Sequence, residues 1–320
     1  MSRLSENKIV LIVRRTRLDD LIARFNTEDQ ARFYIERLGA DFADYQKEDQ
    51  QYKAAVSQTE EILSRMGRLQ VVDRAFLPNF LFGPADIVVA IGQDGLVANV
   101  LKYLDQQRLI GVNPDPARWD GVLLPFGVNE LETILPQVFA EKYHLKKVTM
   151  AEVKLNTGES LFGVNDLFIG PKTHTSARYQ IKIGDKSESQ SSSGVIVSTG
   201  LGSTGWFRSV VAGATGIASA LANQPLGIST KQEFPWDAEY LYFSVREPWP
   251  SKTSSAQIVF GQIVPGTPLI IESRMPEHGV IFSDGIEADF LKFNAGSVAT
   301  ITVAQKKGHL VQRPGKQKKR

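Results

Sequence analysis

The sequence contains no cysteine, which excludes a disulfide framework and any zinc site built from thiolates. It also has no apolar run near the roughly 18 residues that a membrane-spanning helix needs. The first fifteen residues lack the apolar stretch and small-residue cleavage site of a secretory signal. We therefore expect a cytoplasmic protein that contacts no membrane. Its 320 residues, of which 42% are apolar, suffice for one large domain or two ordinary ones.

Acidic residues are absent from the last fifteen positions, so the net charge of +2 hides an uneven distribution. Residues 306–320, "KKGHLVQRPGKQKKR", hold seven of the 37 Lys and Arg residues. The rest of the chain has 30 basic and 35 acidic residues, so the body of the chain is acidic. This balance argues against a nucleic-acid partner. We expect residues 306–320 to form a disordered basic tail.

The first 146 residues alternate short apolar segments with longer helical ones. Strands are expected at 8–15, 68–77, 85–91 and 109–113, and helices at 28–38, 46–66, 96–106 and 129–143. Strands separated by helices indicate parallel βαβ units with helices on both faces of the sheet. We therefore predict an α/β nucleotide-binding domain over residues 1–146, with a doubly wound, mostly parallel sheet.

Residues 147–305 have a different texture, with short apolar segments separated by Gly, Pro, Asn, Asp and Ser. This pattern predicts a mostly antiparallel all-β domain. Residues 160–170, "SLFGVNDLFIG", are expected to be a single strand, and residues 203–222 the one helix of this domain.

Two glycines bracket an acid in "IGQDGLVANVL", residues 91–101, at a predicted strand-to-helix turn. Ligands of doubly wound sheets bind at the carboxyl ends of the strands, and Gly92 and Gly95 would allow close approach of the backbone. Amides at a helix N-terminus favour phosphate. Asp94 would then hold a cation or accept a proton from a substrate hydroxyl, as phosphoryl transfer requires. The alternative is that Asp94 simply caps the helix.

Two further segments have the composition of a ligand site. "STGLGSTGWF", residues 198–207, has three glycines and four hydroxyl side chains between a predicted strand and a helix, which suits phosphate binding or an ordinary turn. Trp206 would either stack on a base or lie in the core. Asn165 and Asp166 interrupt an apolar strand, and a buried polar side chain needs a partner such as a bound sugar or a neighbouring turn.

Taken in order, these segments resemble the NAD kinase family. The resemblance rests on Gly92-Gln93-Asp94-Gly95, Asn165-Asp166, the 198–206 segment and "FSDG" at 282–285. "GVNPDPARWDGVLLP" (111–125) and "FSVREPW" (243–249) are similar to the divergent branch typified by the animal mitochondrial NAD kinase. The resemblance extends from about residue 8 to 305.

The resemblance implies an NAD(H) kinase that phosphorylates the adenosine ribose 2′-hydroxyl with ATP and magnesium to give NADP(H). Asp94 would be the catalytic base, and Asn165 and Asp166 would hold the ribose. The family pattern also implies a homodimer or higher homo-oligomer formed through the β-rich domain. The nucleotide- and dinucleotide-binding residues implied are Gly92, Gln93, Gly95, Asn165, Asp166, Ser198, Thr199, Gly202, Ser203, Thr204, Gly205, Trp206 and Ser209, with Asp284 as a possible addition.

Three residues depart from the family pattern and keep alternatives open. Gln93 stands where the family usually has Gly, Leu96 replaces Thr or a small polar residue, and Ser193 replaces an Asp of many members. Gln93 and Leu96 favour the alternative of a dinucleotide-binding sensor that has lost kinase activity. A lipid or sugar kinase of the same superfamily is the other alternative, although the sequence lacks a clear apolar membrane-facing loop.

Overall fold

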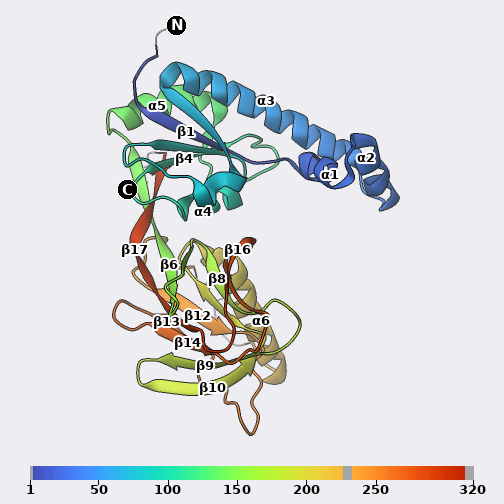
Figure 1. Ribbon diagram of the computed structural model, residues 1–320, viewed down its shortest axis with the longest axis vertical. Coiled ribbons are helices and arrows are strands. Elements are labelled where there is room, and N and C mark those ends of the chain that lie inside the picture. The colour runs from blue at the N-terminus through green and yellow to red at the C-terminus, as the bar shows by residue number, and fades with distance from the viewer. Residues whose placement is uncertain (1–2, 226–232, 314–320) are drawn as a thin grey trace. The chain divides into compact units, whose positions relative to one another are not determined.

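The computed structural model describes residues 3–225 and 233–313, and the chain divides into two compact units (Figure 1). Unit one contains residues 1–146 together with 309–320, and unit two contains residues 147–308. The change of sequence texture near residue 147 coincides with the first of these boundaries. Both boundaries fall within strands, namely β6 (His144–Leu155) and β17 (Val298–Gln312).

Unit one is built on a parallel sheet in the order β2-β1-β3-β4-β17. Its strands are β1 (Lys8–Val13), β2 (Arg68–Asp73), β3 (Ile87–Ile91), β4 (Arg108–Asn113) and the last residues of β17, and the short β5 (Phe126–Gly127) pairs with β4. β3 is buried along its whole length. Helices on both faces of a parallel sheet bury its central strands in this way.

The helices of unit one are α1 (Arg17–Phe25), α2 (Glu28–Arg37), α3 (Phe42–Met66), α4 (Asp94–Leu101) and α5 (Leu131–Phe139). Helices α3 and α5 pack their apolar residues, such as Ile62 and Leu135, against Leu11 and Val89 of the sheet. Helix α4 contacts β3 and β4. The predicted doubly wound α/β architecture is confirmed.

Some expected elements of unit one were misplaced or missed. Helix α1 was missed, although its apolar residues, such as Leu18 and Ile22, recur at helical spacing and Thr16 and Asp19 form a capping box at its start. The strand expected at 68–77 ends at Asp73, which caps the 3₁₀ helix η1 (Arg74–Asn79). In Figure 1, α1 and α2 lie side by side at one end of α3.

Unit two is a sandwich of two sheets. One has the order β13-β12-β11-β8-β15-β16 with antiparallel neighbours, and the other contains β10, β9, β14, β17, β6 and β7. The remaining bounds are β7 (Ser160–Gly163), β8 (Asp166–Pro171), β9 (Ala177–Ile183), β10 (Lys186–Ser192), β11 (Val195–Ser198), β12 (Leu241–Val245), β13 (Phe260–Ile263), β14 (Leu269–Ser273), β15 (Gly279–Ser283) and β16 (Ile286–Lys292). The predicted antiparallel β domain is confirmed.

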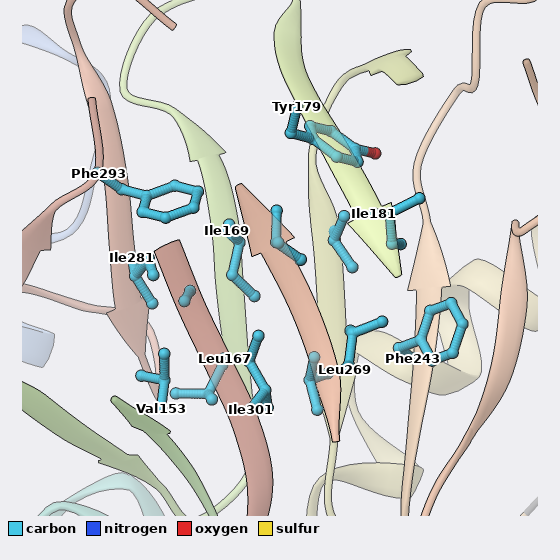
Figure 2. Packing of buried hydrophobic residues seen from close by; sticks show 14 of the residues in the cluster. Val153, Leu167, Ile169, Tyr179, Ile181, Phe243, Leu269, Ile281, Phe293 and Ile301 are labelled. Atoms are coloured by element: carbon cyan, nitrogen blue, oxygen red, sulfur yellow. The ribbon is translucent and has the colours of Figure 1, made fainter. Parts of the chain in front are cut away.

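The core of unit two lies between its sheets, where apolar residues of both interdigitate (Figure 2). Figure 2 shows Leu167, Ile169 and Phe243 from one sheet and Ile181 and Ile301 from the other. The outer face of the first sheet carries α6 (Trp206–Leu221), which follows the 3₁₀ helix η3 (Gly202–Thr204).

Two expectations for unit two are corrected. Residues 160–170 form two strands, β7 and β8, separated by a bend at 164–165. Residues 306–312 are not a disordered tail, because they continue β17, and Leu310 and Val311 are fully buried in unit one. Alternating apolar residues outweigh the local positive charge there. Residues 314–320 lie outside the described residues.

Candidate functional site

The Gly92–Gly95 turn lies at the carboxyl end of β3, and helix α4 begins at Asp94. Gln93 occupies the N-cap position, and its side chain makes no capping hydrogen bond. The alternative that Asp94 caps the helix is therefore wrong, because Asp94 is already the first helical residue. A carboxylate in the first turn is still stabilised by the helix dipole.

The Asp94 carboxylate accepts hydrogen bonds from a loop of unit one nearly thirty residues later. The backbone N–H of Leu123 donates to Oδ1 at 2.8 Å, and that of Val122 donates to Oδ2 at 3.3 Å. Two backbone donors hold the carboxylate in one orientation and leave it further acceptor capacity, since a carboxylate has about four acceptor positions. The side chain of Asp94 is half-buried.

That loop is anchored to helix α3 by an ion pair, and a second ion pair lies within the loop. Arg118 binds the carboxylate of Asp44 and lies 3.7 Å from that of Asp115. Hydrogen bonds from Arg118 and then Arg17 hold the pKa of Asp44 well below its usual range. The anchored loop therefore fixes the amides that orient Asp94.

Arg14 is a candidate that the sequence analysis missed. It directly follows β1, and its Nη2 donates to Glu48 at 2.7 Å while its guanidinium lies over the ring of Tyr52. Its Nε is buried and has no hydrogen-bond partner among the described residues. A Cβ placed on Gly92 would lie 3.6 Å from this Nε. The sequence did contain a signal for Arg14, because it is a basic residue at the end of a predicted parallel strand.

The side chain of Leu96 is buried beneath the turn. It is 3% exposed, and its Cδ2 would meet a Cβ on Gly92 at 3.0 Å, so it packs under the turn. Gly95, in contrast, has no atom within 4 Å of the position of a Cβ. The turn is therefore filled on one side and open on the other.

In unit two, Asp284 organises the turn that carries Asn165 and Asp166. Its Oδ1 accepts the backbone N–H of Asn165 at 2.6 Å and that of Val164 at 3.0 Å, and its own N–H donates to the carbonyl of Asp166. Asp284 has φ of +56°, a left-handed conformation that Asp tolerates better than most residues. The observed contacts thus give Asp284 a positioning role.

Asn165 and Asp166 are adjacent polar residues, in the bend before β8 and at its first position. Neither side chain makes a hydrogen bond to the described residues. Asp166 is 8% exposed, and burial, together with the charge of Asp284, raises the pKa of its carboxyl group to about 7. Asn165 lies in the bend before β8, not inside a strand as expected. A buried carboxylate without a partner is a candidate ligand contact.

The 198–206 segment uses most of its hydroxyl groups internally. Thr199 Oγ1 donates to the carbonyl of Val164, Ser203 Oγ donates to that of Gly200 at 2.7 Å, and Ser198 Oγ donates to that of Thr199. All three hydroxyl side chains are buried, so their bonds fix the loop. Gly202 is packed so tightly that a Cβ would lie 2.0 Å from the carbonyl oxygen of Asn165.

The end of the segment is accessible. Thr204, Gly205 and Ser209 are exposed, and Ser209 Oγ donates a long hydrogen bond of 3.4 Å to the carbonyl of Gly205. Trp206 is half-buried and stacks on Phe168 with 5.7 Å between ring centroids. The predicted site residues thus fall into two groups, one in each unit.

The described ranges contain no group of three or more His, Asp or Glu side chains placed to hold a metal ion. Within the same ranges, no helix has the length and apolarity to cross a bilayer.

No protein-family model matches the chain. A protein named NAD kinase 2 from Geobacillus kaustophilus is 28% identical over 130 residues, which cover 39% of this chain. The chain spans about half (48%) of the length of this curated relative.

Known structures of similar fold cover nearly the whole chain. Yeast NADH kinase complexed with NADH matches with a TM-score of 0.55 and 12% identity, over 97% of this chain and 84% of that one. An NAD kinase from Archaeoglobus fulgidus in complex with ATP matches with a TM-score of 0.55 and 14% identity, over 95% and 93%. The chain therefore has the fold of the NAD kinases, with an α/β unit followed by a β sandwich.

Proposed function

We propose that this chain is an NAD(H) kinase, which transfers the γ-phosphoryl group of ATP to the adenosine ribose 2′-hydroxyl of NAD(H). The fold, the curated relative and the ligands NADH and ATP of the two similar structures support this proposal. The observation that carries it is the free polar pair Asn165 and Asp166, buried or half-buried on a turn that Asp284 fixes. Such a pair suits a diol that both donates and accepts hydrogen bonds.

Asp94 is the proposed general base. The 2′-oxygen of the ribose attacks the γ-phosphorus of ATP while its proton passes to the Asp94 carboxylate. The bond from the γ-phosphorus to the bridging oxygen breaks, and ADP leaves. The amides of Val122 and Leu123 hold the carboxylate in a fixed orientation, which is the contribution of positioning to such a transfer.

Arg14 and the N-terminus of α4 are the proposed contacts of the phosphate donor. Beside Gly92, the Nε–H of Arg14 has no partner among the described residues, and the open side of Gly95 lets backbone amides approach an anion. The side-chain amide of Gln93 makes no hydrogen bond to the described residues and is free to bind the same ligand. Magnesium would arrive with ATP as the Mg–ATP substrate.

The proposal is tested by incubating the purified chain with Mg–ATP and either NAD⁺ or NADH and measuring NADP(H). Product formation supports the kinase. If the chain binds the dinucleotide but forms no product with either ATP or polyphosphate as donor, the alternative of a dinucleotide-binding sensor is supported instead. Phosphorylation of a lipid or sugar acceptor alone would support the other kinase classes. Light scattering of the same sample tests the proposed homodimer.

A further inference from the structure

The loop between β4 and β5, residues 114–125, carries the two amides that bind the Asp94 carboxylate. Its first half is closed by Asn113, the last residue of β4. The Oδ1 of Asn113 accepts the N–H of Asp115 at 3.0 Å, and its Nδ2 donates to the carbonyl of Trp119 at 2.9 Å. Both bonds tie the loop to the end of the strand from which it leaves.

Arg118 ties the same loop to helix α3. Its Nη1 donates to Oδ2 of Asp44 at 3.2 Å, and its Nη2 donates to Oδ1. Two parallel bonds between a guanidinium and a carboxylate restrain orientation as well as distance. Arg118 stands four residues before Val122 and five before Leu123. Its ion pair therefore restrains the part of the loop that leads directly to those amides.

The charge of Arg118 is used within unit one. Its guanidinium contacts Asp44 and lies 3.7 Å from the carboxylate of Asp115, and its side chain is 23% exposed. Two neighbouring carboxylates offset its positive charge, so Arg118 is poorly suited to bind a phosphate. Its influence on chemistry in unit one runs through the loop.

Asp44 also belongs to a charge network that reaches the proposed contact of the phosphate donor. Arg17 Nη2 donates to Asp44 at 2.8 Å, and Arg17 Nε donates to Glu48 at 3.3 Å. Glu48, which is 4% exposed, accepts a further bond from Arg14 at 2.7 Å. A buried carboxylate needs such cations to stay ionised. The loop that orients Asp94 and the side chain of Arg14 thus share one network.

We propose that Arg118 is a positioning residue for the phosphoryl transfer, because its ion pair with Asp44 sets the loop so that the two loop amides aim the Asp94 carboxylate at the ribose hydroxyl. The inference rests on the proposed function, in which Asp94 accepts the proton of that hydroxyl. A displacement of about 1 Å at a reacting group can cost roughly a hundredfold in rate. Loss of the ion pair should therefore lower turnover without changing what the chain binds.

Steady-state kinetics of Arg118→Gln test this role. We expect turnover with Mg–ATP and NAD(H) to fall by roughly tenfold to a hundredfold, and the KM values of both substrates to stay within about twofold of the parent's. Arg118→Lys keeps the positive charge but loses the planar fork, so it should recover part of the lost turnover. Arg65→Gln is the matched control, because Arg65 pairs with Glu132 at 3.0 Å near the other end of α3 and should turn over like the parent.

A double-mutant cycle shows whether Arg118 acts through Asp94. In the Asp94→Asn background the base is already lost, so Arg118→Gln should change turnover by less than about twofold. Amide hydrogen exchange adds a measurement that needs no activity. The N–H groups of Val122 and Leu123 should exchange faster in Arg118→Gln than in the parent, because the loop opens more often.

Asp44→Asn removes the same ion pair from the other side, so it provides the same test if Arg118→Gln does not fold. Parental turnover in the folded variants, or unchanged exchange of the two amides, would overturn the positioning role while a product-forming parent leaves the kinase proposal intact. An equal loss of turnover with and without Asp94 would also overturn it, because Arg118 would then act elsewhere. A parent chain that forms no product would overturn the kinase proposal and the positioning role with it.

Discussion

Asp94 combines an observed structural role with the catalytic role that we propose for it. Its oxygens accept two backbone N–H groups, and its position at a helix N-terminus stabilises its charge. Asp94→Asn retains only one acceptor oxygen and cannot act as a base. We expect turnover to fall by roughly 10² to 10⁴, and the free energy of unfolding to fall by about 1 kcal/mol for the lost bond.

Steady-state kinetics and chemical denaturation of Asp94→Asn measure the two effects separately. NAD affinity, measured by calorimetry, should change little. Turnover within a few-fold of the parent, with only stability lost, would show that Asp94 is a structural residue.

The carboxyl group of Asp166 is expected to stabilise the folded chain when it is protonated and to destabilise it when it is ionised. Its pKa is raised from the ordinary 3.8 to about 7, so between these values the folded chain holds a proton that the unfolded chain has released. The free energy of unfolding therefore falls as pH rises through this window, and the loss is complete above it. At about pH 8, Asp166→Asn should stabilise the chain by ~1–3 kcal/mol, and at about pH 4 it should have little effect.

The same Asp166→Asn variant should lose NAD affinity, by about 1.5 to 3 kcal/mol if the charged carboxylate accepts ribose hydroxyls. Denaturation at the two pH values and calorimetry with NAD measure both effects. A variant with unaltered affinity would remove Asp166 from the site, and stabilisation equal at both pH values would contradict the titration.

At the scale of elements, two glycines in the two loops have opposite surroundings. A Cβ on Gly202 would strike the backbone oxygen of Asn165 at 2.0 Å, and no side chain can move to relieve it. Gly202→Ala should therefore lower the free energy of unfolding by roughly 1–3 kcal/mol, as overpacking does, and should displace the turn that carries Asn165. Denaturant titration measures the loss, and an unchanged midpoint would mean that the loop adapts freely.

Gly95→Ala provides the contrast in the other loop. A Cβ there meets nothing within 4 Å, and alanine favours the helix, so the free energy of unfolding should stay equal or rise by up to ~1 kcal/mol. If a phosphate approaches this open side, the KM for ATP should rise several-fold in the same variant. Kinetics and denaturation together test this, and an unchanged KM would place the phosphate elsewhere.

At the scale of the whole molecule, β17 belongs to both units. Its first residues pair with β14, and His309 and Leu310 pair with β4. A chain that ends at residue 305 would expose the edge of β4 and lose the buried Leu310 and Val311, each worth about 1.5–3 kcal/mol. We expect the chain that ends at residue 305 to have a much lower melting temperature than the parent, as measured by circular dichroism. A chain that ends at Arg313 retains β17 and should melt like the parent. Equal melting of the two truncated chains would show that this end of the strand is dispensable.

The amino-acid sequence by itself determined the features that depend on neighbours along the chain. Continuous apolar segments such as 87–91 identified buried parallel strands, and the strand-glycine-acid order placed Asp94 in the turn between a strand and a helix. The local pattern misled where it was mixed, as in the charged but alternating residues 306–312. In α1 the helical spacing of the apolar residues and the capping box were present in the sequence but were missed.

Only the tertiary structure decided which polar groups are satisfied. The partners of Asp94 lie 28 and 29 residues away, and Asp284 lies almost 120 residues from the turn that it fixes. Hydrogen bonds across such separations leave no periodic trace in the sequence, so the bonded hydroxyl of Thr199 and the unbonded carboxylate of Asp166 look equally suited to a ligand. Folding distinguishes them, because it gives the Thr199 hydroxyl a carbonyl partner and leaves the buried Asp166 carboxyl group without a hydrogen-bond partner among the described residues.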